Sequence, residues 1–356
     1  MAIIYSIIFI TFLCALILTP IAIKLAKKFN LVDIPNDARR VHVKPMPRIG
    51  GIAIVGAMFI GFLLYYLITK DIPTIALSEK FLGFILGASV IALMGFIDDV
   101  VDLKARYKFL FQLVAATICY FYGITIGGIK IPFIYTNIID FGLLDFPVTL
   151  IWIIGITNAV NLIDGLDGLA AGITAISATA LLIIFIATSA SLEAIVITAV
   201  LLGAVLGFLP FNFNPAKTFM GDVGSNFLGF CLAVVSILGF AKGYTLIAII
   251  APILALGVPI FDTLFAMVRR FLKGQPMLKP DGAHIHHRLL KHGFNQRQAV
   301  LILYTITSAL CIVAVLIVAA DFWKLILLIL AMICFVTFGL FSVRKEKHKR
   351  LDKKNE

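Results

Sequence analysis

The sequence predicts an all-α polytopic integral membrane protein with about 11 transmembrane helices, its N-terminus outside and its C-terminus in the cytoplasm. Hydrophobic residues make up 61% of the 356 residues and charged residues only 14%, against about 25% charged in an average soluble domain. Apolar runs recur along the whole chain, and about 20 such residues cross a bilayer. We therefore expect one transmembrane domain, residues 1–343, followed by a basic cytoplasmic tail, residues 344–356.

The expected membrane spans are helices, because a backbone in lipid must satisfy its own hydrogen bonds. Between the fourth and fifth spans, residues 127–146 are less apolar, alternate between apolar and other residues over 129–135 and hold Pro132, which favours an external loop with a short hairpin. The expected spans are residues 2–23, 50–69, 81–97, 109–125, 146–160, 169–189, 192–209, 223–240, 244–265, 299–319 and 325–341.

The distribution of cations predicts the orientation. With the N-terminus outside, only Lys70, Lys80, Lys130, Lys242 and Lys324 of the 30 Lys and Arg residues lie outside. This bias follows the positive-inside rule. Contact with anionic lipid explains the net charge of +11, so we expect the lipid bilayer as a partner and no nucleic acid.

Residues 158–169 concentrate polar side chains between two apolar runs. Asn158, Asn161, Asp164 and Asp167 recur every three residues and would lie near one side of a continuous helix. The glycines within this stretch equally favour a turn or a close approach of backbone to a ligand. A helix-capping turn between two spans is the alternative to a binding site.

The third expected span ends in a group of carboxylates. Asp98 and Asp102 are four residues apart and would share a helix face, with Asp99 beside them. Like charges this close repel unless a divalent cation or positive side chains compensate. The alternative is a set of solvated Asp–Lys pairs at a helix end.

The first cytoplasmic connection is basic. Arg39, Arg40, His42, Lys44 and Arg48 precede a Gly-Gly pair, and clustered cations with flexible glycine suit capture of a diphosphate or a lipid phosphate. An ordinary juxtamembrane basic loop would have the same composition.

Residues 210–225 form a further cytoplasmic connection with polar and aromatic side chains. Asp222 stands just before the eighth span, where it could equally be a helix N-cap. Asn212, Asn214 and Phe219 supply hydrogen-bonding and stacking groups suited to a nucleobase.

The largest cytoplasmic connection contains His284, His286, His287 and Arg288. Without cysteine nearby, these residues fit a diphosphate clamp or a general acid better than a zinc site. A solvated basic loop is the alternative. Asp262, near the end of the ninth span, is either a polar residue of helix packing or a further carboxylate of the site.

Four motifs in a fixed order resemble the polyprenyl-phosphate N-acetylhexosamine-1-phosphate transferase family over nearly the whole chain. They are Asp98-Asp99-x-x-Asp102, Asn158-x-x-Asn161-x-x-Asp164-Gly-x-Asp167-Gly-Leu, Phe219-Met-Gly-Asp222-x-Gly-Ser and His284-Ile-His286-His287-Arg288. The last motif and the first basic loop are similar to the UDP-GlcNAc enzymes that start teichoic acid, O-antigen or related glycans. The branch that transfers phospho-MurNAc-pentapeptide usually has three consecutive histidines, which this chain lacks.

The resemblance implies transfer of GlcNAc-1-phosphate from UDP-GlcNAc to undecaprenyl phosphate with release of UMP, at the cytoplasmic face of the cell membrane. It implies Mg²⁺, with Mn²⁺ as the alternative ion, a homodimer as a plausible assembly, and Asp222 as the leading metal ligand. Asp99 would either bind the ion directly or support Asp222 without touching the ion. Asp98 would be the base that prepares the lipid phosphate for the reaction. Either the lipid phosphate attacks directly or an Asp acts first as nucleophile. The implied substrate-binding residues are Arg39, Arg40, Lys44, Arg48, Asn158, Asn161, Asp164, Asp167, Asn212, Phe219, His284, His286, His287 and Arg288.

Other classes of protein fit the sequence less well. A phospho-MurNAc-pentapeptide transferase keeps the same chemistry and is the nearest alternative. An ion-coupled transporter predicts carboxylates near the midplane and broken helices in related halves; only Pro252 and Pro259, in the ninth span, point that way. A membrane prenyltransferase needs a second aspartate-rich motif of the same kind.

Overall fold

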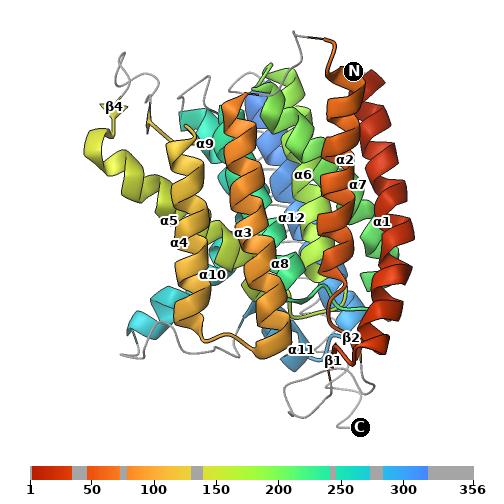
Figure 1. Ribbon diagram of the computed structural model, residues 1–356. Coiled ribbons are helices and arrows are strands. Elements are labelled where there is room, and N and C mark those ends of the chain that lie inside the picture. Colours follow the sequence, from red (N-terminus) through yellow and green to blue (C-terminus); the bar gives the residue numbers. More distant parts are fainter. Residues whose placement is uncertain are drawn as a thin grey trace.

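The computed structural model describes residues 2–33, 46–72, 78–129, 139–240, 246–272 and 284–319. Long helices dominate and run side by side in one bundle (Figure 1). The helices are α1 (Ala2–Lys28), α2 (Gly51–Thr69), α3 (Glu79–Val101), α4 (Ala105–Phe121), α5 (Asp145–Ile163), α6 (Leu169–Ala187), α7 (Leu192–Asn212), α8 (Gly221–Phe240), α9 (Leu246–Ala255), α10 (Gly257–Leu272), α11 (Ile285–Lys291) and α12 (Gln296–Ala319).

Two short hairpins and a 3-10 turn lie at the ends of the bundle. Strand β1 (Val32–Asp33) pairs with β2 (Met46–Pro47), and β3 (Gly128–Ile129) pairs with β4 (Ile139–Asp140), both antiparallel. The 3-10 turn η2 (Gly142–Leu144) leads into α5. The β3–β4 pair confirms the hairpin predicted between the fourth and fifth spans.

Eight helices among the described residues are long and apolar enough to cross a membrane. The protein is therefore an all-α membrane protein that crosses the bilayer several times. Ten of the 11 expected spans fall on described helices, and the eleventh, residues 325–341, lies outside the described residues together with the basic tail.

Helix α8 is the centre of the bundle. Its apolar window is 89% buried, against 28% for that of α1 at the edge, and α8 contacts α2, α3, α5, α6 and α7. Small residues permit this close packing: a Cβ added at Gly229 would stand 2.8 Å from the Cα of Thr157 on α5. Carboxylates at the start of α8 therefore lie among several neighbouring helices.

The ninth expected span is not one helix, which corrects that prediction. The chain breaks at Leu256 between α9 and α10. Pro259 has no N–H to donate to the carbonyl of Ala255 four residues earlier, and the Oγ of Ser177 donates to that oxygen instead, at 2.5 Å. The Sγ of Cys311 lies 3.8 Å from the same oxygen. Neighbouring helices thus satisfy the carbonyl that the proline leaves free.

The end of α3 also differs from the prediction. Asp102 has φ 53 and is the left-handed C-cap of the helix, so it does not continue the helical face of Asp98. Its side chain is exposed, whereas Asp98 and Asp99 are buried. The expectation that Asp98 and Asp102 share a helix face is therefore wrong, because the helix ends one residue too early.

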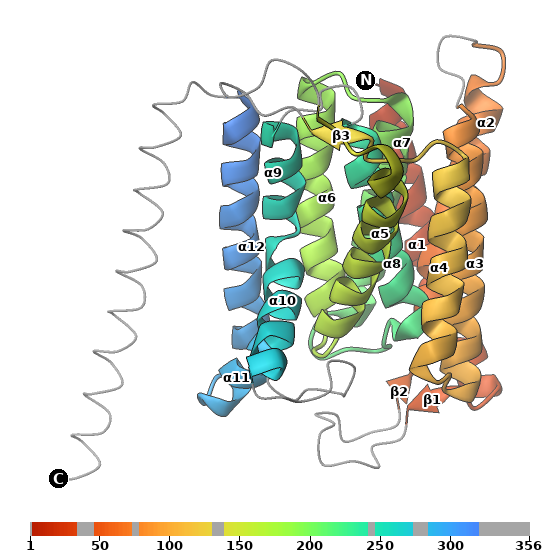
Figure 2. The same cartoon turned by 90° about the vertical axis from the view of Figure 1, so that its left-hand side faces the viewer.

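The ends that carry the sequence motifs gather on one side of the bundle. Figure 2 shows β1, β2, α11 and the lower ends of α3, α4 and α5 at the end opposite the start of α1. This arrangement brings segments far apart in the sequence to one end of the bundle.

Candidate active site

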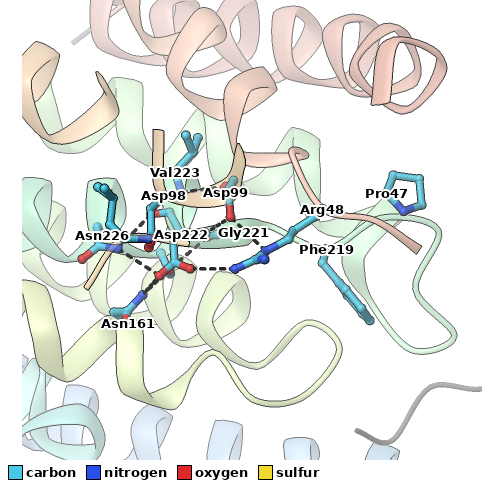
Figure 3. Close-up of polar contacts among 12 residues, drawn as sticks. Pro47, Arg48, Asp98, Asp99, Asn161, Phe219, Gly221, Asp222, Val223 and Asn226 are labelled. Carbon is cyan, nitrogen blue, oxygen red and sulfur yellow. Dashed lines mark hydrogen bonds and ion pairs between the residues drawn. The ribbon is translucent and has the colours of Figure 1, made fainter. Parts of the chain in front are cut away.

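The side chain of Asp222 has polar partners from three other segments, of which Arg48 and Asn161 are labelled in Figure 3. Its Oδ2 pairs with Nη2 of Arg48 at 3.2 Å, and its Oδ1 accepts a hydrogen bond from Nδ2 of Asn161 at 2.9 Å. Nζ of Lys108 lies 3.6 Å from the same Oδ1. The side chain of Asp222 is 18% exposed, so it reaches the open space beside it while its position is held by neighbours.

Asp99 binds the first turn of α8, the helix that carries Asp222. Its two oxygens accept hydrogen bonds from the backbone N–H groups of Asp222 and Val223, at 2.9 and 3.1 Å. Oδ1 also lies 3.1 Å from Nε of Arg48. A carboxylate at a helix N-terminus satisfies free N–H groups and opposes the positive end of the helix dipole. Asp99 is therefore the N-terminal cap of α8, supplied by α3.

Asp98 faces a different cation. Its Oδ2 pairs with Nζ of Lys108, and its Oδ1 accepts from the backbone N–H of Leu103 at 2.8 Å. Its side chain is fully buried. Lys108 and the N–H of Leu103 thus partner the two carboxylate oxygens and offset part of the cost of burying this charge.

Glycine makes this approach of α3 to α8 feasible. Gly221 has φ +71, and a Cβ there would collide with the carbonyl oxygen of Arg48 and with Asp99. On α3, a Cβ at Gly95 would collide with the backbone of Val223. Larger residues at either position would separate Asp98 and Asp99 from Asp222.

An amide network lies behind Asp222. Nδ2 of Asn226 donates to the carbonyl of Asp222 at 2.9 Å, and its Oδ1 accepts from Nε2 of Gln112 at 3.2 Å. Gln112 in turn accepts from Nδ2 of Asn158 at 2.7 Å. The sequence-predicted residue Asn158 therefore belongs to this network between α4, α5 and α8, and its contact with substrate stays a prediction.

Beside Asp222 opens a cavity of about 710 Å³, within the size range of small-molecule sites. Several residues predicted from the sequence line it, which brings the second, third and fourth motifs and the first basic loop to one space. These lining residues are Arg48, Asn161, Asp164, Asp167, Asn212, Phe219, Asp222 and His287.

The turn between α5 and α6 forms one wall of this cavity. Helix α5 ends at Ile163, so Asp164 and Asp167 lie on the turn and do not extend the helical face that begins with Asn158. Burial, followed by the nearby carboxylates of Asp222, Asp99 and Asp167, raises the pKa of Asp164 to about 7. A bound cation would favour its charged form.

The loop between α7 and α8 forms the facing wall. Nδ2 of Asn212 donates to the carbonyl of Thr218 at 3.0 Å, while its buried Oδ1 accepts no hydrogen bond from the described residues. Phe219 donates its backbone N–H to the carbonyl of Pro47 at 2.8 Å, which ties this loop to the segment that carries Arg48. The free acceptor of Asn212 and the aromatic residue Phe219 thus lie on the same wall of the cavity.

The histidine motif is held by Asp262. Its Oδ2 lies 3.0 Å from Nδ1 of His284, and its Oδ1 accepts from the backbone N–H of Ile285 at 2.9 Å. Asp262 does not line the cavity and positions the histidine motif through its first residues, a role that neither of the two interpretations from the sequence had given it. His284 itself is buried and does not line the cavity.

The remaining residues of the motif differ in exposure. His286 packs against Gly165, where a Cβ would collide with its ring. Burial and the neighbouring rings of His287 and His284 lower the pKa of His286 to about 4, so it is neutral at pH 7. His287 lines the cavity, and the guanidinium of Arg288 lies 5.5 Å from the ring centre of Phe265.

Some site residues were missed in the sequence, and others lie outside the described residues. Lys108 and Gln112 were missed although they stand four residues apart in the apolar α4, a spacing that places both on one helix face. That periodic pair of polar residues was the available signal. Arg39, Arg40 and Lys44 lie in residues 34–45, outside the described residues.

The donors fit Mg²⁺ as a shared ligand set. In proteins Mg²⁺ usually takes one or two carboxylates plus substrate phosphates and water. The described residues contain no group of three His, Cys, Asp or Glu side chains placed to hold an ion alone. Asp222 is partly exposed at the cavity, so it could bind Mg²⁺ together with substrate phosphates. Both oxygens of Asp99, in contrast, already have partners in α8 and Arg48.

Comparisons with known proteins identify the family. A family model described as glycosyl transferase family 4 matches residues 81–240. The chain is 39% identical to a probable undecaprenyl-phosphate N-acetylglucosaminyl 1-phosphate transferase of Bacillus subtilis, over 97% of this chain and 96% of the relative. It is 36% identical to a decaprenyl-phosphate N-acetylglucosaminephosphotransferase of Mycolicibacterium smegmatis, over 79% of this chain and 73% of the relative. A phospho-N-acetylmuramoyl-pentapeptide-transferase of Clostridioides difficile is 32% identical, over 86% of this chain and 95% of the relative.

The helical bundle, the carboxylate site and these relatives define a membrane-embedded glycosyl-1-phosphate transferase. The chain belongs to the polyprenyl-phosphate N-acetylhexosamine-1-phosphate transferases of glycosyl transferase family 4.

Proposed function

We propose that this protein transfers GlcNAc-1-phosphate from UDP-GlcNAc to undecaprenyl phosphate, releases UMP and so starts a cell-envelope glycan such as teichoic acid or O-antigen. The observation that carries the proposal is the cluster of Asp98, Asp222, Arg48 and Lys108 beside a cavity of about 710 Å³. The similarity to the Bacillus subtilis relative over nearly the whole chain supports the choice of substrates.

The diphosphate of the sugar nucleotide would bind at the Asp222 end of the cavity. Arg48 presents a guanidinium there, and its bidentate geometry suits phosphate oxygens. Mg²⁺, bound through Asp222 and the diphosphate, would neutralise the charge that develops on the leaving phosphate. Asn161 and Asp99 keep Asp222 in place from two sides.

Asp98 is suited to receive a proton from the lipid phosphate. Lys108 stabilises its carboxylate form, and the two residues lie at the ends of α3 and α4 that carry the motifs. Lys108 also lies near Asp222, so one cation would face both phosphates as they approach each other. Reduced repulsion between two anionic reactants is the main contribution expected of such a site.

The uridine would lie between the two loops that form the cavity walls. Phe219 offers a ring for stacking, and Asn212, Asp164 and Asp167 offer acceptors for the base and the ribose. His287, from the motif held by Asp262, would contact the sugar diphosphate. We place this end of the bundle at the cytoplasmic face, because Lys and Arg concentrate in the connections at that end.

Release of UMP by the purified protein tests the proposal. The assay supplies Mg²⁺, undecaprenyl phosphate and either UDP-GlcNAc or UDP-MurNAc-pentapeptide. We expect release with UDP-GlcNAc alone, lowered about 10²- to 10³-fold in Asp222→Asn. The matched control is Asp102→Asn, a nearby aspartate that is exposed and does not line the cavity, and it should retain activity.

Each other outcome has a defined meaning. Release with the pentapeptide substrate would keep the mechanism and assign the protein to peptidoglycan synthesis, the activity that the Clostridioides difficile relative's name describes. No release with either substrate from folded protein would reject both donors. Equal loss in Asp102→Asn and Asp222→Asn would reject the assignment of Asp222.

A further inference from the structure

We propose that Asn214 reads the uracil of the sugar nucleotide through its side-chain oxygen, and that Gln296 is a positioning residue that keeps this oxygen turned to the cavity. The inference rests on the proposed function, because it assigns the nucleobase contact of the same site. Both residues line the cavity, and only Asn214 was predicted from the sequence as a nucleobase contact.

Both hydrogens of the Asn214 amide are committed to protein acceptors. Nδ2 donates to Oδ2 of Asp167 at 2.9 Å and to Oε1 of Gln296 at 3.0 Å. A primary amide has two N–H donors and one carbonyl acceptor. The orientation of the amide is therefore determined by two acceptors, one on the α5–α6 turn and one at the start of α12.

The oxygen of the same amide is what remains for a ligand. Among the described residues none donates to Oδ1 of Asn214, and the side chain is half-buried at the cavity wall. Phe219 and Asn212 lie on the same loop and line the same cavity. The group offered to a base stacked there is a hydrogen-bond acceptor.

A hydrogen-bond acceptor at this position distinguishes uracil from cytosine. Uracil has an N–H donor at N3, whereas cytosine has an unprotonated N3 acceptor and an exocyclic amino group at C4. An amide oxygen facing N3 would accept from uracil and repel the corresponding atom of cytosine. If the amide turned over, the preference would reverse, so Asn214 selects uracil only while its orientation is held.

The rest of the start of α12 supports the same loop. Nη2 of Arg297 donates to the backbone carbonyl of Asn214 at 3.0 Å, and the hydroxyl of Tyr304 donates to the carbonyl of Gly168 at 2.5 Å. Helix α12 therefore braces both walls of the cavity, and Gln296 is its contact with the base-reading amide.

Binding of UMP and CMP, measured by calorimetry on the purified full chain with Mg²⁺, tests the inference. Gln296→Met removes the acceptor at similar volume, and Gln296→Glu keeps it. We expect the preference for UMP over CMP to fall about five- to tenfold in Gln296→Met, as for one lost hydrogen bond, and to persist in Gln296→Glu. Asn214→Ala should lose the preference to the same extent.

Gln298→Met is the matched control for a general effect on the start of α12. Gln298 is exposed, and its Oε1 accepts from the backbone N–H of Asn295, so its loss weakens the helix start without touching Asn214. The inference is overturned if Gln298→Met lowers the preference as much as Gln296→Met, if Gln296→Met retains it, or if Gln296→Glu loses it.

The assay separates the two proposals. UMP release from UDP-GlcNAc by the wild-type protein tests the proposed function alone. Turnover without a preference for UMP over CMP would reject the reading by Asn214 and leave the function in place. A preference that depends on Gln296, without turnover, would reject the function and leave the nucleobase site.

Discussion

Asp99 caps the N-terminus of α8, the helix that carries Asp222 in its first turn: its two carboxylate oxygens accept hydrogen bonds from backbone N–H groups of α8, at 2.9 and 3.1 Å. Two carboxylates from motifs 123 residues apart thus have different tasks. The buried one holds a helix, and the partly exposed one faces the cavity. The different exposures of the two side chains make the distinction measurable.

Asp99→Asn should lower stability more than Asp222→Asn. An amide has one oxygen for two N–H groups and loses the ion pair with Arg48, which costs about 2 kcal/mol. Asp222 is partly exposed, and its cations retain Asp98 and Asp99 as partners. Thermal unfolding in detergent and UMP release, measured on both variants, should show a lower midpoint for Asp99→Asn and lost activity in both. Equal midpoints would contradict the capping role.

Gly95→Ala should impair both folding and activity. The added Cβ meets the backbone of Val223 and would push α3 away from α8, and with it Asp98 and Asp99. Gly155→Ala is the matched control, because Gly155 is also helical and a Cβ there has no atom within 4 Å. We expect the control to be neutral or stabilised by about 0.5–1 kcal/mol. UMP release and thermal unfolding compare the pair, and similar losses in both variants would refute the close-packing argument.

His286 should make stability depend on pH below about 6.5. The folded protein protonates His286 only near pH 4, because the ring is buried and other histidines lie beside it, whereas an unfolded histidine takes up its proton near pH 6.5. The free energy of unfolding therefore falls as pH falls from about 6.5 to 4, by at most about 3 kcal/mol. The contribution is complete above pH 6.5.

The His286→Asn variant tests this pH dependence. Thermal midpoints of the wild-type protein and the variant, measured between pH 4 and 7.5, should show a flatter profile in the variant. Profiles of the same slope would show that other groups cause the dependence. The comparison uses the slope, so a uniform loss of stability in the variant does not affect it.

Ser177→Ala should destabilise the break between α9 and α10. Its hydroxyl donates to the carbonyl of Ala255, to which Pro259 cannot donate a backbone N–H. The variant leaves this buried acceptor with only the weak Sγ–H donor of Cys311, and loss of the stronger donor costs about 1–3 kcal/mol. Thr179→Val is the control, because the Thr179 hydroxyl bonds only to the carbonyl of Ala175 in its own helix, at 2.8 Å. Thermal unfolding should show the larger loss in Ser177→Ala, and the reverse order would exclude Ser177 as the principal donor.

The sequence by itself determined the class of the protein and the position of most helices. Membrane crossing depends on the length and hydrophobicity of each segment, which are local properties. Each of the Asp, Asn and His motifs is likewise a short stretch of sequence, and their order along the chain was enough to predict the family that the comparisons confirm. The ninth span was predicted as one helix, although the break at Leu256 lies between its two prolines, Pro252 and Pro259.

Only the tertiary structure decided how the polar residues pair. Asp99 and Asp222 have the same side chain and both stand at helix ends, yet one caps the helix of the other because α3 packs against α8 at Gly95. The partnership of Gln296 with Asn214 joins residues 82 positions apart. Such pairs depend on distances between helices that are distant in the chain, and residue type and spacing carry no information about those distances.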